Sequence, residues 1–311
     1  MIRLIINRIL VAFPVLLAVI SLTFFMVHSA PGGPFDYDRA VSPEVMEQLN
    51  EKYNLDAPLY RQYFDYLSNL IRGDFGPSFR YPGRSVTEMI SIGLPITFEL
   101  AMYSILFAAL LGISLGSIAA LKHNTWLDYF PMSISMAGIC IPSIILGPIL
   151  ALIFGIWLGW LPVSGWGEGY PGSKVLPIVT LGTAYAAYCA RLSRGGMLEI
   201  LGQDFIRTAR AKGLSEFRVI VVHALRGGLI PVVSFLGPAI AGLLAGSFVV
   251  ETIFNIPGLG RFYVQAAFNR DYTMILGTTI FFSFLIILFN LIADIVGAAM
   301  DPRVREEYSD E

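Results

Sequence analysis

Six long apolar runs, separated by shorter polar segments, organise the 311 residues of this chain. A helix needs about 17–25 predominantly apolar residues to cross the hydrocarbon core of a bilayer, and each run reaches that length. The pattern predicts membrane-spanning helices at residues 9–29, 96–121, 129–158, 175–193, 229–250 and 272–300. The fourth run is the most polar, with Thr180, Thr183, Tyr185 and Tyr188. Lining of a cavity and burial among other helices are both compatible with that polarity.

Glycine and proline recur inside these runs. Pairs of glycines four residues apart occur at Gly112 and Gly116, Gly155 and Gly159, and Gly242 and Gly246. Such pairs allow close helix contact, and packing within one bundle is favoured over a dimer seam. Pro142 and Pro148 interrupt the third run. Broken helices mark substrate paths in transporters, although proline is also frequent in ordinary membrane helices.

The segment between the first two runs, Ala30–Pro95, is patterned rather than a plain linker. Ser42-Pro43-Glu44 has the features of a helix start, with a cap, a proline at the first position and an acid in the first turn. A second helix is expected to begin at Pro58. Ser85 and Glu88 form a capping box that leads toward the second span. A folded loop is therefore expected on this side of the membrane.

The most charged short segment between two apolar runs is Gln203–Arg226, with the sequence QDFIRTARAKGLSEFRVIVVHALR. Asp204 can cap a helix, and Gly213 fits a helix end with a left-handed residue. A second short helix is expected to start at Ser215 and to be broken by the glycines at 227 and 228. Its apolar residues fall on one face, at Phe217, Ile220, Val221, Ala224 and Leu225.

The first of these short helices combines small and basic side chains. The small residues are Thr208, Ala209 and Ala211, and the basic residues are Arg207, Arg210 and Lys212. Small residues let another protein approach the helix backbone closely. A basic amphipathic segment resting on anionic lipid is the alternative. Because the small residues supply little apolar area for lipid, we interpret the segment as a docking element.

Composition and charge support an integral membrane protein. The chain is 55% hydrophobic and 14% charged, with a mean hydropathy of +0.67, whereas soluble domains carry about 25% charged residues. Lys and Arg of the short loops gather on the side that holds both termini and Gln203–Arg226, which predicts that this side is cytoplasmic. The first run exceeds the apolar core of a signal peptide, so we expect an uncleaved span. No pattern for nucleic-acid binding is present.

Motifs for catalysis or metal binding are missing from the sequence. His28, His123 and His223 belong to separate segments, and neither a zinc-protease motif, a G-x-S-x-G motif nor a Walker A motif occurs. Cys140 and Cys189 both lie in apolar runs, so a disulfide framework is not expected. These features disfavour a membrane enzyme or a quinone-site subunit, which would need clustered polar residues within the spans.

Two acidic residues lie near the ends of apolar runs, Glu99 in the second and Asp294 in the sixth. An intramembrane acid is a functional candidate by default. An interfacial acid paired with Arg or Lys is an equally suitable interpretation for each. An ion-coupled secondary transporter would want ionisable residues at mid-span, and both acids are too peripheral for that role. The pattern favours a transport subunit that receives work from a separate motor.

The docking segment resembles the loop signature of permease subunits of binding-protein-dependent ABC importers, E-A-A-x-x-x-G and then I-x-L-P. Arg207-Thr208-Ala209 stands in place of E-A-A, Gly213 matches the glycine, and His223–Arg226 replaces I-x-L-P. R-T-A-R-A-K-G-L is similar to the variant of the dipeptide, oligopeptide and nickel branch. Further similar segments are Ala30–Gly32, Gly73–Phe79, Trp160–Trp166, Glu251–Phe254, Pro257–Gly260, Asn269–Tyr272 and Asp301-Pro302. Gly73–Phe79 and Trp160–Trp166 look most like the oligopeptide-permease subunits of the B type.

The resemblance implies an all-α integral membrane protein with six transmembrane helices in the MetI-like fold of type I ABC importer permeases. Residues 1–95 would form the first span and a folded extracytoplasmic loop. Residues 96–311 would form a five-span core that contains the cytoplasmic coupling loop 194–228. The subunit would be embedded in the lipid of the inner (plasma) membrane. It would form half of a translocation pathway that works by alternating access.

The resemblance also implies partners and a docking site. The partners are a second permease subunit, two ATPase subunits that bind ATP and Mg, and an extracytoplasmic peptide-binding protein. This chain itself would hold no cofactor or metal and hydrolyse no ATP. The helix that docks onto the ATPases would comprise Asp204, Phe205, Arg207, Thr208, Ala209, Arg210, Ala211, Lys212 and Gly213. Oligopeptides are the expected substrate, with dipeptides or nickel as alternatives within the branch.

Overall fold

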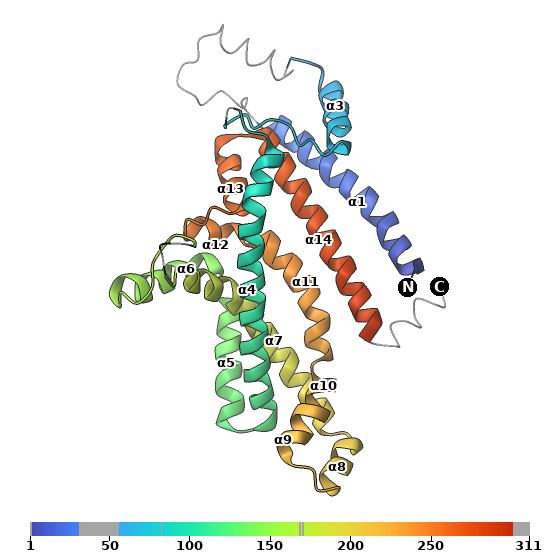
Figure 1. Ribbon diagram of the computed structural model, residues 1–311, viewed down its shortest axis with the longest axis vertical. Helices are drawn as coiled ribbons and strands as arrows, with labels where there is room; N and C mark the ends of the chain where they lie inside the picture. The colour runs from blue at the N-terminus through green and yellow to red at the C-terminus, as the bar shows by residue number, and fades with distance from the viewer. Residues whose placement is uncertain (1, 31–55, 82, 168, 170, 301–311) are drawn as a thin grey trace.

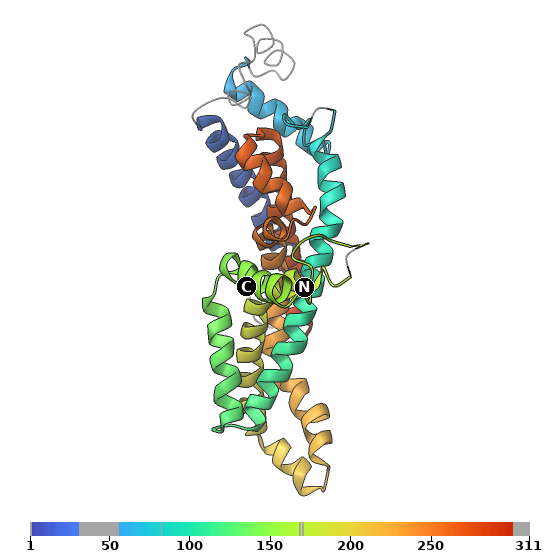
Figure 2. The ribbon, with the colours of Figure 1, turned by 90° about the vertical axis from the view of Figure 1, so that its left-hand side faces the viewer.

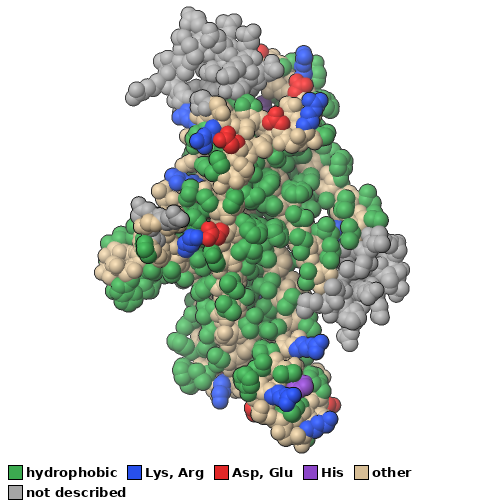
Figure 3. All heavy atoms as spheres, viewed as in Figure 1, with side chains coloured by type: hydrophobic (Ala, Val, Ile, Leu, Met, Phe, Trp, Pro, Cys, Tyr) green, Lys and Arg blue, Asp and Glu red, His purple; other side chains and the backbone are tan. Residues whose placement is uncertain are grey.

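The computed structural model describes residues 2–30, 56–81, 83–167, 169 and 171–300, and within these residues the regular elements are all helices. They form an elongated body, with α3 (Leu59–Ile71) at one end and α8 (Asp204–Ala211) at the other (Figure 1). Charged side chains gather near these two ends, and hydrophobic side chains cover most of the surface between them (Figure 3). This distribution fits a protein whose middle lies in a bilayer.

Five stretches of helix are long and apolar enough to cross a membrane. Four are the single helices α1 (Ile2–Ser29), α4 (Val86–Leu121), α7 (Val175–Leu201) and α14 (Tyr272–Met300). The fifth consists of the consecutive helices α11 (Ile230–Gly246) and α12 (Phe248–Ile253). The predicted third span makes the number six when its two parts are counted together. The all-helical membrane fold expected from the apolar runs is confirmed.

The third span is not the straight helix over residues 129–158 that its apolar run suggested. It consists of α5 (Trp126–Cys140), followed by α6 (Ser143–Leu150) and the π-helix η1 (Ala151–Trp157), and the two parts are bent by 109°. Pro142 lacks an amide hydrogen and disfavours helical backbone at the residue before it, and Ile141 is extended, with φ −87° and ψ 113°. Figure 2 shows α5 running from near the α8 end to the middle of the molecule, where α6 lies across it.

Helix α4 begins earlier than its apolar run. The run predicted a start at residue 96, but the helix begins at Val86 and is 36 residues long. Ser85 caps it by accepting a hydrogen bond from the Glu88 amide at 3.1 Å, which confirms the predicted helix start at the capping box. The cap therefore sets the first turn, whereas hydropathy marks only the later part. Residues 95 and 96, where we divided the chain, both lie inside α4.

Helix α3 confirms the helix predicted to start at Pro58, which occupies its N-terminal cap position. It packs on α1, where the Tyr63 and Ser21 hydroxyls are 2.6 Å apart and the Tyr63 ring lies 5.3 Å from that of Phe24. Gly73 follows the helix with a left-handed φ of +78°, which glycine adopts without strain. The helix start expected at Ser42-Pro43-Glu44 lies outside the described residues.

Helix α7 packs centrally, and glycines bring its neighbours close. A β-carbon on Gly116 would lie 2.2 Å from the Ala190 carbonyl oxygen of α7, and one on Gly112 would lie 2.5 Å from that of Ala186. These glycines serve packing within the bundle, as predicted. Burial among other helices accounts for part of the polarity of the fourth run, because Thr180 is buried and donates a hydrogen bond to the Leu176 carbonyl.

We expect an alanine substitution to have different effects at a closely packed glycine and at an open one. Gly116→Ala should destabilise the chain by about 1–3 kcal/mol, because its methyl group would overlap backbone atoms of α7. Gly246→Ala is the matched control, since nothing lies within 4 Å of a β-carbon there. Alanine should leave stability at that position unchanged or raise it slightly. Thermal unfolding of both variants in mild detergent measures the difference, and equal midpoints would contradict the packing assigned to Gly116.

A buried acid closes the loop between α12 and α13 (Leu259–Asn269) against α4. Glu251 is fully buried and accepts hydrogen bonds from the Thr97 hydroxyl at 2.7 Å, the Ser247 hydroxyl at 2.8 Å and the Arg261 amide at 2.9 Å. A β-carbon on Gly258 would lie 2.4 Å from a carboxylate oxygen of Glu251. Glycine at this position is therefore what lets the loop approach the carboxylate so closely.

A second buried acid fastens the segment before α4 to the start of α14. Asp271 is 1% exposed and accepts hydrogen bonds from the Ser78 hydroxyl and from the amides of Phe79 at 3.2 Å and Arg80 at 3.3 Å. It also accepts from the amide of Met274 in α14 at 3.2 Å. One side chain at the α3 end therefore joins two segments that lie far apart in the sequence.

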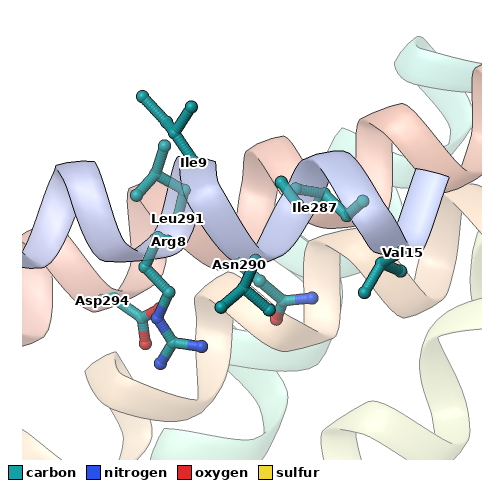
Figure 4. A pocket seen from close by; sticks show the side chains of 9 residues that line it. Arg8, Ile9, Val15, Ile287, Asn290, Leu291 and Asp294 are labelled. Carbon is teal, nitrogen blue, oxygen red and sulfur yellow. The ribbon is translucent and has the colours of Figure 1, made fainter. Parts of the chain in front are cut away.

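Glu99 and Asp294, the two acids near the ends of apolar runs, are each paired with a basic residue, which is one of the two interpretations given above. Glu99 forms an ion pair with Lys174, and the Lys174 ammonium also lies 5.0 Å from the Trp166 ring centre. Arg8 of α1 and Asp294 of α14 are 2.9 Å apart. They flank an apolar cavity of about 310 Å³ between these two helices, in which Asn290 is a further polar side chain (Figure 4).

Candidate docking site

The charged segment between α7 and α11 forms a compact group of short helices at the α8 end (Figures 1 and 2). Helix α8 is followed by α9 (Glu216–Arg218), the π-helix η2 (Val219–Ala224) and α10 (Leu225–Gly228). The predicted left-handed helix end is confirmed at Gly213, which has a φ of +76°. The predicted second helix does begin after Ser215. Two short helical stretches therefore project from the bundle here.

The expectation that Asp204 caps α8 is wrong by one residue. Gln203 is the cap residue, with an extended backbone of φ −74° and ψ 149°, and Asp204 is the first residue of the helix. No side chain provides a capping hydrogen bond there. A carboxylate in the first turn still interacts favourably with the positive end of the helix dipole. Asp204 also lies 3.3 Å from the Arg207 guanidinium.

One face of α8 packs on this chain itself. Its inner side belongs to a buried cluster that joins α8 to α4, α7 and η2, formed by Ala120, Met197, Ile206, Ala209, Val219 and Ala224. Ala209 is only 7% exposed, so its small size serves the packing of α8 on its own chain. This corrects our expectation that Ala209 lets another protein approach. The cluster seats α8 against η2 and places it beside the end of α7.

The opposite face of α8, which we call the outer face, is exposed at Phe205, Thr208 and Ala211. Phe205 is 50% exposed. Small and aromatic side chains that share one exposed face suit close contact with another protein. Of the small residues singled out from the sequence, the structure therefore places Thr208 and Ala211 on this face and Ala209 behind it.

The basic residues of the segment have different surroundings. Arg210 reaches Glu216 of α9 through two hydrogen bonds of 2.8 and 3.3 Å, which fix α8 relative to α9. Arg207 pairs with Asp204 on the surface. Lys212, at the end of α8, is exposed and has no ion-pair partner within the described part of the chain. The outer rim of the site is therefore positively charged.

The apolar stripe predicted for the second helix is only partly correct. Ala224 is buried as expected, but Phe217 is 76% exposed and Val221 is 43% exposed, whereas Val219 is fully buried. The stripe assumed α-helical spacing, and η2 is a π-helix with a wider turn, which changes the face that each side chain occupies. The expected break at the glycines is confirmed, because Gly227 and Gly228 are the last two residues of α10 and Leu229 separates it from α11.

Gly228, the last residue of α10, also has a packing role. A β-carbon on Gly196 of α7 would lie 2.2 Å from the carbonyl oxygen of Gly228. Only a pair of glycines permits the backbones of α7 and α10 to cross this closely. The contact seats the short helices against α7.

An ion pair that the sequence analysis missed lies beside this group. Asp128 of α5 is 1% exposed and lies 2.5 Å from Nε and 2.8 Å from Nη2 of Arg194 in α7. It also accepts a hydrogen bond from the Asn124 amide at 3.0 Å and contacts His123 Nδ1 at 3.1 Å. The pair joins the start of α5 to α7 a short way before α8. Opposite charges near the same ends of two predicted spans were the available signal.

The described residues contain no group of three His, Cys, Asp or Glu side chains that could hold a metal ion. His123 is engaged with Asp128, and His28 stacks on Phe24 with ring centres 4.1 Å apart.

A bundle of membrane-length helices that presents a short, exposed helix pair at one end is the arrangement of a membrane subunit in a multi-component transporter. Comparison with protein families agrees. Residues 112–306 match the binding-protein-dependent transport system inner membrane component, and residues 1–101 match the N-terminal model of such membrane components. The chain belongs to this family of binding-protein-dependent transport permeases.

Individual relatives cover nearly the whole chain. The oligopeptide transport system permease protein OppB of Haemophilus influenzae is 48% identical over 305 residues, which are 98% of this chain and 100% of that protein. OppB of Escherichia coli K12 is 46% identical over the same shares of both chains. The dipeptide transport system permease protein DppB of Bacillus subtilis is 43% identical over 93% of this chain and 94% of that one.

Solved structures show the same fold. A chain of the MetNI methionine ABC transporter, in an inward-facing conformation, superposes with a TM-score of 0.58 at 19% identity. The superposition covers 68% of this chain and 96% of that chain. The MetI-like permease fold inferred from the resemblance is thereby confirmed.

Proposed function

We propose that this chain is one of two permease subunits of an ATP-driven importer of oligopeptides. Oligopeptides are proposed as the substrate because of the full-length similarity to two oligopeptide permease proteins, at 48% and 46% identity. A second permease subunit would complete the pathway. Two ATPase subunits would bind ATP and Mg and hydrolyse ATP, and an extracytoplasmic binding protein would deliver the peptide. This chain would contribute binding and movement without a cofactor of its own.

The outer face of α8 would dock onto the ATPase subunits. The proposal is supported by the exposure of Phe205, Thr208 and Ala211 and by the rigid seating of the inner face through Ile206 and Ala209. Closure of the ATPases on ATP would displace α8, and the buried cluster would pass that displacement to α7. Alternating access of the bundle would follow from this motion.

The orientation in the membrane follows from the basic loops. The short helices around α8 contain Arg207, Arg210, Lys212 and Arg218. The ends of the predicted spans on the same side contain Lys122 and Arg194. The positive-inside rule places this end, together with both termini, in the cytoplasm of an inner (plasma) membrane. Helix α3 would then lie on the external side, where the binding protein docks.

Import of dipeptides is the second candidate within the branch, and the 43% identity to a dipeptide permease favours it over import of nickel. One experiment decides between oligopeptides and dipeptides. The chain is purified from its native membrane in mild detergent with whatever binds it, reconstituted in proteoliposomes, and assayed for ATP hydrolysis. We expect a second permease, two ATPases and a binding protein to copurify, and oligopeptide-loaded binding protein to stimulate hydrolysis. Stimulation by dipeptides alone, or recovery of a lone chain, would contradict the proposal.

A further inference from the structure

A groove follows the facing sides of α5 and α7 from the bend of the third span toward the α8 end. Its first part has a volume of about 250 Å³ and is lined by Pro142, Thr180 and Tyr185, among others. Its second part has a volume of about 450 Å³ and is lined by residues that include Met132 and Arg191. Ile139 lines both parts, so the two adjoin each other. The groove therefore leads from the helix break to the proposed cytoplasmic end.

The second part of the groove has one unbalanced charge. Its lining contains three charged side chains, Asp128, Arg191 and Arg194. Asp128 and Arg194 neutralise each other across 2.5 Å. Arg191 has no ion-pair partner among the described residues, and its guanidinium carbon lies 5.0 Å from the centre of the Tyr188 ring. The lining carries one net positive charge, and Arg191 supplies it.

Arg191 is an exposed residue of α7, near the end of the predicted span at residues 175–193. A guanidinium at this depth avoids hydrocarbon by turning toward water or a polar group. The groove provides that surrounding. An anionic group that enters it would find a guanidinium with free hydrogen-bond donors.

The remainder of the lining suits ligands of variable shape. Met132 and Met136 are one helical turn apart on α5, and Met136 is 59% exposed. Methionine is flexible and polarisable, so it adapts to side chains of different form. Ser135 adds a hydroxyl on the same face. An adaptable apolar surface beside one fixed cation fits a molecule with a variable body and a constant anionic end.

We propose that this groove forms the inward half of the peptide path in this subunit, and that Arg191 binds the C-terminal carboxylate of the peptide. A guanidinium binds a carboxylate through two parallel hydrogen bonds, and every unmodified linear peptide carries that group. The variable side chains would lie along Met132 and Met136. The proposal rests on the proposed function, because it names the contact that the imported peptide makes on leaving the bend.

The test compares one peptide in two forms, with a free C-terminal carboxylate and with a C-terminal amide. Uptake of each is measured in proteoliposomes that contain the complete importer, with this chain wild type, Arg191→Gln or Arg191→Lys. A charge-assisted hydrogen bond corresponds to roughly tenfold in affinity or more. We expect Arg191→Gln to lower the ratio of free-acid to amide uptake roughly tenfold, through the KM of the free acid. Arg191→Lys should retain most of the preference.

The design isolates the contribution of this chain. The binding protein is the same in every sample, so its own preference for a carboxylate cancels in the comparison between variants. Lys122→Gln, which removes an exposed cation at the same end but outside the groove, is the matched control and should leave the ratio unchanged. An unchanged ratio in Arg191→Gln overturns the proposal. An equal loss for both peptide forms also overturns it, because that result would assign Arg191 to a lipid phosphate.

A second measurement does not depend on replacing Arg191. Met136→Cys, made in a Cys140→Ser background, should react with a charged, water-soluble maleimide, because the groove admits water. Free-acid peptide should slow that reaction during turnover. A thiol at residue 136 that stays unreactive would place this face of α5 in lipid and overturn the path. If the wild-type importer carries no peptide of either form, the proposed function itself has failed, whereas normal import with an unchanged ratio rejects Arg191 alone.

Discussion

Replacing Asp128 by alanine is expected to destabilise the protein at the α8 end. Asp128 is 1% exposed and holds Arg194 through contacts of 2.5 and 2.8 Å. Removing Asp128 leaves Arg194, whose side chain is 28% exposed, without its carboxylate. Because this position is intermediate between a surface pair, worth about 0–1 kcal/mol, and a fully buried one, worth about 3–5 kcal/mol, we expect a loss of about 1–3 kcal/mol. The midpoint of thermal unfolding of the purified chain in mild detergent measures the effect.

Two further variants show whether burial is the cause. Asp204→Ala also removes an aspartate paired with an arginine, but the Asp204 side chain is 93% exposed, and surface pairs contribute about 0–1 kcal/mol. Its midpoint should stay near that of the wild type. Adding Arg194→Met to Asp128→Ala should recover much of the loss, because the unpaired charge is gone. A wild-type midpoint for Asp128→Ala would show that the pair does not hold α5 to α7.

Ala211→Trp is expected to reduce peptide import at least about tenfold while the chain still inserts and folds. A tenfold change corresponds to only about 1.4 kcal/mol, and a large side chain on a tightly packed protein contact costs at least that much. Ala211 is on the exposed outer face of α8, so tryptophan disturbs a bound ATPase and not the packing of this chain. Uptake, ATP hydrolysis and thermal stability are measured on the same reconstituted sample.

The choice of position decides what this experiment can show. Ala209→Trp would be a weaker test, because Ala209 is buried against its own chain and a bulky residue would displace α8 even without a partner. Lys122→Trp adds the same side chain at an exposed position of the same end, outside α8, and should import normally. Wild-type import by Ala211→Trp would remove the outer face of α8 from the docking surface.

Local signals in the sequence predicted much of the fold. The apolar runs gave the number of spans, because crossing a bilayer requires a minimum length of apolar helix. Ser85 marked the true start of α4, since a cap acts on amides only a few residues away. Gly213 marked the end of α8 through a backbone conformation that glycine adopts without strain. Each of these features depends on neighbouring residues alone.

The docking segment was also found from the sequence, but its faces were not. Charge and small residues located it between two apolar runs, and the short helices formed where they were expected. Which side of α8 is buried depends on α4, α7 and η2, and the π-helical turn of η2 changes the spacing on which an α-helical stripe relies. Ala209 was therefore assigned to the wrong face.

The contacts that hold the helices together were decided by tertiary structure. Asp128 meets Arg194 from 66 residues away, and Glu251 meets Thr97 from 154 residues away. Neither partner can be read from its neighbours, because the pairing depends on how each helix is rotated and where it crosses the others. The sequence by itself determined which segments enter the membrane, where α4 begins and where α8 ends, since those follow from local hydropathy and backbone preference. Only packing decided which side chains face one another, and with that the groove that Arg191 lines.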